Sequence, residues 1–157
     1  MNSKYEISTK ENREFLKASC EELLNFGHRF PSPNGGSYYL GDDGTPWKDR
    51  NRETWITCRM AHVYSLGLML GHEGSEELAD AALKGLKGEL HDEKNGGWYA
   101  GVTPEGDIVP NKQCYAHAFV ILAASSALTA GRPGAKELLE EALAVYDRYF
   151  WNEEEGL

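Results

Sequence analysis

Arg59 is the one formal charge between Trp55 and Gly71, within the apolar stretch TWITCRMAHVYSLGLML. A guanidinium keeps its charge in proteins, so its burial requires partner oxygens or a polar cavity. Trp55, Arg59 and His62 follow an i, i+4, i+7 spacing, which places them on one face of a helix. An aromatic ring beside a forked donor suits a sugar, because the ring stacks on the apolar sugar face and arginine binds its oxygens. We therefore predict a carbohydrate-binding helix face; the alternative is a structural arginine paired with a distant carboxylate.

A second segment, QCYAHAF, supplies Tyr115 and His117. Tyr115 lies 60 residues after Trp55, and because the chain repeats with about that period, both rings are expected on the same side. His117 leaves a regular helix about 200° around from Tyr115. We predict that Tyr115 binds substrate and that His117 reaches it from the rim of the site. Helix packing is the alternative for both, and His62 is interpreted as a core histidine.

The repeat is carried by a Gly-Gly-aromatic turn that occurs twice, as NGGSYYLGDDG at 34–44 and as NGGWYAGVTPEG at 95–106. A shift of about 60 residues also aligns GHEGSEEL with GRPGAKEL, and LHDEKNG with FWNEEEG at the end of the chain. Self-similarity at a fixed period indicates a repeat architecture. The chain therefore contains roughly two and a half copies, and a third turn begins near its C-terminus.

Each copy predicts a β-hairpin followed by two helices that differ in character. The first helix of each copy is apolar or small on all sides, which indicates burial, whereas the second carries an apolar stripe and a charged face. Such an alternation predicts an all-α fold, with helical hairpins arranged in a ring and small β-hairpins on its rim. Helices are expected at 10–26, 53–70, 75–90, 112–130 and 135–150, with one hairpin from 37 through the Gly-Asp-Asp-Gly turn to 45 onward and a second at 98–109.

Composition excludes several classes of partner. The formal net charge of −9 argues against nucleic acid and anionic membranes as partners. The apolar segment 113–131 contains too many polar and small residues for a membrane span. Cys20, Cys58 and Cys114 lack metal-ligand spacing and suggest reduced thiols, and the N-terminus shows no apolar signal region. We predict a cytoplasmic protein without metal or cofactor.

Several catalytic groups are not visible in these segments. Proton abstraction next to a carbonyl needs a positioned base, yet the expected inner helices offer only His62 and His117. Glycoside hydrolysis needs two opposed carboxylates, and Glu53, at the start of the first inner helix, is interpreted as a first-turn surface charge. The sequence thus predicts a binding wall without its catalytic counterpart.

Three motifs resemble the N-acylglucosamine 2-epimerase family, most closely its aldose–ketose isomerase branch of mannose and sulfoquinovose isomerases. They are TWITCRMAHVYSLG, NGGWYAGVTPEGDIVPNKQCYAHAF and RYFWNEEEGL. The resemblance implies that residues 1–157 are the N-terminal part of a single (α/α)6 barrel domain. It also implies metal-independent interconversion of an aldose and a ketose, of the mannose/fructose type, by C1–C2 proton transfer through a cis-enediol. The acid and base histidines would then lie beyond residue 157.

The family pattern carries over at four positions. Arg59 would stabilise a substrate oxygen, Trp55 and Tyr115 would shape the pocket, and His117 matches the Q-x-Y-x-H motif. The expected partner is a monosaccharide substrate, and a homo-oligomer is compatible with the sequence. The alternatives are a sulfoquinovose isomerase, an N-acylglucosamine or aldose 2-epimerase, a toroidal glycosidase, and, if 157 residues are the whole protein, a non-catalytic carbohydrate-binding fragment.

Overall fold

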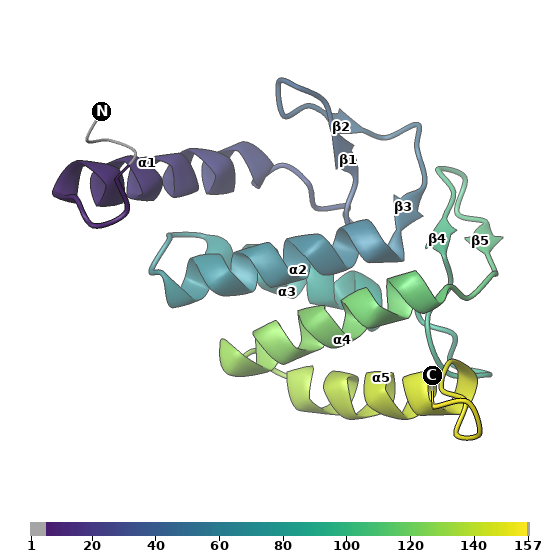
Figure 1. Cartoon of the computed structure of the whole chain (residues 1–157). Helices are drawn as coiled ribbons and strands as arrows, with labels where there is room; N and C mark the ends of the chain where they lie inside the picture. The colour runs from purple at the N-terminus through teal and green to yellow at the C-terminus, as the bar shows by residue number, and fades with distance from the viewer. Residues whose placement is uncertain (1–5, 157) are drawn as a thin grey trace.

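The computed structural model of the chain describes residues 6–156, which form five helices and five short strands (Figure 1). The helices are α1 (Lys10–Gly27), α2 (Thr54–Met69), α3 (Ser75–Leu86), α4 (Cys114–Thr129) and α5 (Ala135–Tyr149). Four of them end within two residues of the predicted limits. The exception is α3, predicted to reach Leu90.

The early end of α3 has a local cause. The backbone N–H groups of Gly88 and Leu90 both turn back to the carbonyl of Gly85, at 3.3 and 3.2 Å. This tight turn brings Leu90, only 1% exposed, into the core. We infer that burial of the Leu90 side chain contributes more free energy than one more turn of α3 would.

The helices form two layers, as the repeat predicts. Helix α2 packs against both α3 and α4, and α4 packs against α5, so that α2 and α4 are the neighbouring inner helices (Figure 1). Most of the buried residues of these two helices are small, which lets neighbouring helices approach closely. They include Cys58, Ala61, Ser65 and Gly67 of α2, and Ala116, Ala123, Ala124 and Ala127 of α4.

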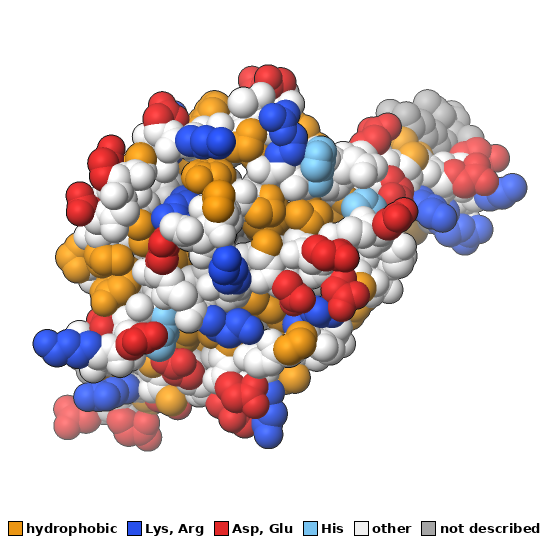
Figure 2. Space-filling model, turned by 180° about the vertical axis from the view of Figure 1, so that it is seen from behind, with side chains coloured by type: hydrophobic (Ala, Val, Ile, Leu, Met, Phe, Trp, Pro, Cys, Tyr) orange, Lys and Arg blue, Asp and Glu red, His pale blue; other side chains and the backbone are white. Residues whose placement is uncertain are grey.

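The outer helices carry the charged surface. Seen from behind, the molecule presents acidic and basic side chains interspersed with apolar ones (Figure 2). Arg132, just before α5, donates to Glu76 and Asp80 of α3, each at 2.7 Å, and so ties the two outer helices together. No helix within residues 6–156 is long and apolar enough to cross a membrane.

Short strands join the two copies along one end of the helices. Strands β1 (Tyr39–Leu40) and β2 (Pro46–Trp47) form the first hairpin, and β4 (Gly101–Val102) and β5 (Ile108–Val109) form the second. Strand β3 (Arg52–Glu53) comes from the first copy but pairs antiparallel with β4 of the second. This three-stranded sheet fixes the start of α2 against the second hairpin.

The repeated Gly-Gly turn has a structural purpose in the first copy. Gly36 has a φ of +81°, a conformation that favours glycine. The N–H of the following residue, Ser37, donates to Thr57 Oγ1 of the inner helix at 3.0 Å, and both residues are fully buried. The turn therefore pins the hairpin to the helix behind it.

The second copy repeats this arrangement with a different acceptor. Gly97 has a φ of +80°, and the N–H of Trp98 donates to His117 Nε2 at 3.1 Å. His117 lies 60 residues after Thr57, at the same position of the repeat. The third turn is also present at its start, because Gly156 N–H bonds to the carbonyl of Asn152 at 2.8 Å. The prediction of a third turn is confirmed.

Candidate substrate-binding site

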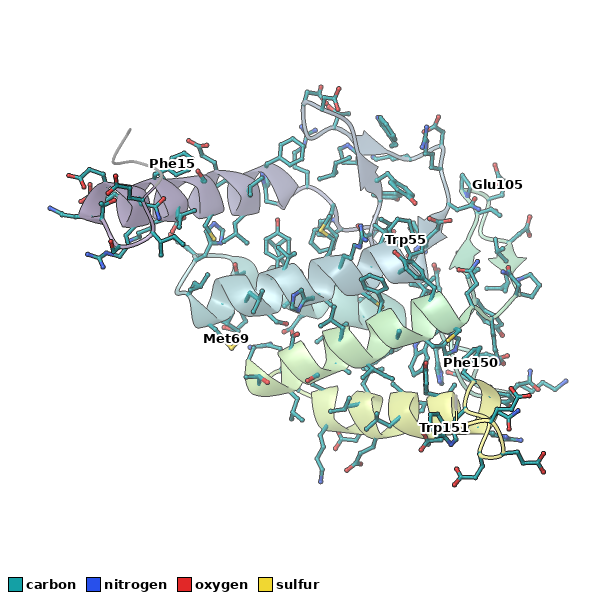
Figure 3. The ribbon with its side chains drawn as sticks, viewed as in Figure 1. Phe15, Trp55, Met69, Glu105, Phe150 and Trp151 are labelled. Atoms are coloured by element: carbon teal, nitrogen blue, oxygen red, sulfur yellow. The ribbon has the colours of Figure 1, made fainter. Side chains whose placement is uncertain are left out.

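The N-terminal parts of the two inner helices bring three predicted site residues together. Trp55 lies at the N-terminal end of α2, beside the strands (Figure 3). Its ring centroid is 6.0 Å from that of Tyr115, the second residue of α4, in an edge-on arrangement. The guanidinium carbon of Arg59 lies 4.8 Å from the Trp55 ring centroid. The grouping that the i, i+4 spacing and the repeat predict is therefore found.

The Arg59 side chain is exposed to solvent. One of its terminal nitrogens lies 3.4 Å from the Tyr115 hydroxyl, and both side chains are exposed, Tyr115 by 54%. Among residues 6–156, no carboxylate lies within salt-bridge distance of Arg59. The structural ion pair of the alternative is therefore not found within this part of the chain. Stacking on aromatic rings orients the fork and leaves its N–H groups for a ligand.

Phe119 is a site residue that sequence reasoning missed. Its ring lies 5.1 Å from the guanidinium carbon of Arg59 and 5.0 Å from the Tyr115 ring. Arg59 is thus held between an aromatic side chain of α2 and one of α4. The signal was available, because Phe119 follows Arg59 by 60 residues and occupies the same position of the repeat.

Glu53 and Tyr39 were also missed. Glu53 Oε2 accepts a hydrogen bond from the Trp55 indole N–H at 2.9 Å and another from the Tyr39 hydroxyl. Burial raises the pKa of Tyr39 above its ordinary value, and the hydrogen bond to Glu53 raises it further, so the phenol stays protonated as a donor. The interpretation of Glu53 as a first-turn surface charge was wrong, because Glu53 is the N-cap residue of α2 and its carboxylate makes part-buried hydrogen bonds.

The contacts between aromatic rings and guanidinium groups, described above for Trp55 and Arg59, continue onto the first hairpin. The guanidinium carbon of Arg50 lies 4.3 Å from the Trp47 ring and 5.9 Å from the Tyr39 ring. Tyr39 in turn lies 6.3 Å from Trp55, edge-on. The site is therefore one end of a continuous strip of rings and guanidinium groups that crosses from β2 to α4.

His117 is the one predicted site residue that the structure places elsewhere. It is fully buried between the second Gly-Gly turn and α5, with its ring 4.8 Å from that of Phe150. Its Nδ1–H donates to the carbonyl of Gln113 at 2.8 Å, while Nε2 accepts from Trp98 N–H. Burial lowers its pKa below the ordinary value, which favours this neutral form. The expectation that His117 reaches substrate from the rim gives way to the packing alternative.

His62 lies in the contact between the inner helices. The Ser126 hydroxyl donates to the carbonyl of Leu122 at 2.8 Å, so His62 Nδ1, 2.7 Å from Ser126 Oγ, is the donor in that pair. This bond joins α2 to α4 through partly buried groups. Its environment agrees with the interpretation as a core histidine.

The geometry defines a class of protein: a helical scaffold that carries an exposed arginine flanked by aromatic rings on its inner helices. Its family follows from comparison with known proteins. Residues 35–157 match the N-acylglucosamine 2-epimerase (GlcNAc 2-epimerase) family, and the chain belongs to this family.

Relatives in the family give the comparison more detail. The chain is 41% identical over 146 residues to D-mannose isomerase of Thermobifida fusca, a match that spans 92% of this chain and 36% of that protein. It is 37% identical over 150 residues to D-mannose isomerase of Pseudomonas cannabina pv. alisalensis, spanning 96% of this chain and 36% of that protein. The chain thus spans little more than a third of these relatives.

Solved structures agree on the fold. A crystal structure of D-mannose isomerase superposes with a TM-score of 0.82 at 24% identity, over 98% of this chain and 39% of that one. Cellobiose 2-epimerase from Bacillus thermoamylovorans B4167 gives 0.77 at 24% identity, over 92% of this chain and 39% of that one. The predicted fold class, helical hairpins of an (α/α)6 barrel with small hairpins on the rim, is confirmed.

Proposed function

We propose that this chain supplies the substrate-binding wall of a metal-independent aldose–ketose isomerase of the mannose/fructose type. The observation that carries the proposal is Arg59, stacked between Trp55 and Phe119 with its N–H groups open beside the Tyr115 hydroxyl. The names of the relatives, D-mannose isomerase, support the choice of sugar. In this proposal the chain is the N-terminal part of a single (α/α)6 barrel.

Each of these side chains has a role in the proposed reaction. An open-chain sugar lies against Trp55, and the Arg59 fork binds the oxygens on C1 and C2. As the C1–C2 proton moves, negative charge develops on these oxygens in the cis-enediolate, and a preorganised cation stabilises that charge more than it stabilises the ground state. Tyr115 can donate a further hydrogen bond. The acid and base that move the proton come, in this proposal, from polypeptide beyond residue 157.

The surface of the inner helices supports a larger assembly. Val63, Leu66 and Leu122 on α2 and α4 are each 40% exposed, although they belong to the apolar inner layer. We propose that further helical hairpins of the barrel cover these side chains and enclose the sugar. Enclosure would also exclude water, which strengthens the interaction of Arg59 with its substrate.

The proposal is tested on the complete protein with D-mannose in deuterated water. Proton NMR should show conversion to D-fructose, with deuterium entering at the exchanged carbon, because an enediol exchanges its proton with solvent. Activity should survive dialysis against EDTA. Formation of the C2 epimer without a ketose would assign the protein to the 2-epimerases, and faster turnover of sulfoquinovose would change the substrate. Sugar binding without turnover would support the non-catalytic alternative.

A further inference from the structure

Glu53 connects the two aromatic side chains on its side of the site. One carboxylate oxygen, Oε2, accepts from both Tyr39 and the Trp55 indole N–H. Trp55 then stacks on Arg59, which lies beside Tyr115. A single carboxylate therefore begins a chain of contacts that ends at the cation expected to meet the substrate.

The backbone around Glu53 is unusually well fixed. On one side, Arg52 is 8% exposed and donates to the carbonyl of Gly35 at 3.0 Å and to Glu89 at 2.6 Å. On the other side, the Thr54 hydroxyl donates to the carbonyl of Tyr99 at 2.6 Å. The ladder between β3 and β4 holds Glu53 itself. A side chain on so rigid a base can orient its neighbours accurately.

The Glu53 carboxylate does not cap the helix, although capping is the common role of a polar side chain at the N-cap position. Glu53 is the N-cap residue of α2, with extended backbone (φ −95°, ψ 144°), but its side chain makes no capping hydrogen bond. It turns instead toward Tyr39 and Trp55.

We propose that Glu53 is a positioning residue, which fixes the Trp55 and Tyr39 rings so that Arg59 presents its N–H groups in the productive orientation. This inference rests on the proposed function for its effect on turnover, but not for its effect on Trp55. Free rotation of the indole would remove the stacking partner on one side of Arg59. Binding and turnover would then both suffer, without loss of the fold.

The test compares two substitutions of Glu53 in the complete protein. Glu53→Leu removes the acceptor and should lower kcat/KM by about 10–100-fold, the range expected for a misplaced catalytic group. Glu53→Gln keeps an amide oxygen in place of Oε2 and should recover most of that loss. The matched control is Glu141→Gln on the distant α5 helix, which replaces a carboxylate whose Oε1 lies 2.6 Å from His91 Nε2 and should leave kcat/KM unchanged.

A coupling measurement separates positioning from a general structural effect. In a Tyr39→Phe, Trp55→Phe background neither donor remains, so Glu53→Leu should cause little further loss of kcat/KM. Equal loss in both backgrounds would overturn the proposal, because Glu53 would then act by another route. Loss of activity that follows a fall in melting temperature, without rescue by Glu53→Gln, would overturn it as well.

A second readout does not depend on turnover. With 5-fluorotryptophan incorporated, the ¹⁹F signal of Trp55, assigned from its disappearance in Trp55→Phe, should shift or broaden in Glu53→Leu and stay close to wild type in Glu53→Gln. If the wild-type protein shows no isomerase activity, the proposed function fails while this signal still tests Glu53. An unchanged Trp55 signal in Glu53→Leu would overturn the positioning role.

Discussion

Thr57 offers the sharpest test of how the repeat holds its turns. Thr57→Val exchanges the Oγ1 hydroxyl for a methyl group of nearly the same shape, so it opens no cavity. It does leave the buried Ser37 N–H without the acceptor that now lies 3.0 Å away. An unsatisfied buried donor costs about 1–3 kcal/mol, so we expect the free energy of unfolding to fall by about this amount.

The matched variant is Thr57→Ser, which keeps the hydroxyl and loses only a methyl group, at a cost of about 1 kcal/mol. Urea unfolding of the complete protein measures the two losses, and hydrogen exchange of the Ser37 amide separates their causes. Exchange should accelerate in the valine variant and stay slow in the serine variant. If Thr57→Val left both the stability and the Ser37 exchange rate unchanged, the turn would not depend on this bond, and the explanation of the repeated motif would be wrong.

Three further predictions concern charge. Arg59→Ala should lower kcat/KM by about 100–1,000-fold, as for other transition-state donors, with an unchanged unfolding midpoint; an unfolded variant would indicate a structural role instead. Lys112 holds the pKa of Asp92 well below its ordinary value through a hydrogen bond and a 2.8 Å ion pair, with Asn95 adding to the effect. The stability from this carboxylate is present above about pH 4 and is lost as the pH falls. Lys112→Met should therefore reduce stability at neutral pH, with the difference from wild type shrinking toward pH 2 in acid titrations followed by circular dichroism. Because burial lowers the pKa of His117, the unfolded chain binds the proton first, and stability should fall as the pH drops below the ordinary value of 6.5; a His117→Gln variant should show a smaller fall, and an equal fall would point to another histidine.

The 60-residue repeat predicted most of the fold, because side chains at equivalent positions of the two copies face the same way. A spacing of 60 residues placed Trp55 and Tyr115 together, and the structure brings their rings within 6.0 Å. The same spacing would have placed Phe119 opposite Arg59. A periodic sequence thus predicts the site wherever the contacts are made between equivalent positions on α2 and α4.

The pairing of β3 with β4 could not be predicted in the same way, because it joins different parts of two copies. At Gly101 an added Cβ would lie 2.8 Å from the carbonyl oxygen of Arg52, so the strands can approach only because this residue is glycine. In the sequence, Gly101 reads as part of a turn. The requirement for glycine comes from a neighbour about 50 residues away, and no local pattern reports it.

The error at His117 has a physical lesson for the candidate site. A helix wheel gives the direction in which a side chain leaves the helix, but not what lies there. His117 leaves α4 toward the turn of its own copy, where Trp98 N–H needs an acceptor, as Ser37 N–H does in the first copy. The histidine thus fills the structural role of Thr57.

The error at Glu53 is the reverse case. A glutamate at a helix start is commonly a solvated first-turn charge, so local reasoning assigned it to solvent. Its extended N-cap backbone instead directs the carboxylate toward Tyr39, 14 residues earlier, and Trp55, two residues later. In the proposed function, the orientation of Arg59 therefore depends on where the strands end and the helix begins, since this junction aims Glu53 at Trp55, which stacks on Arg59.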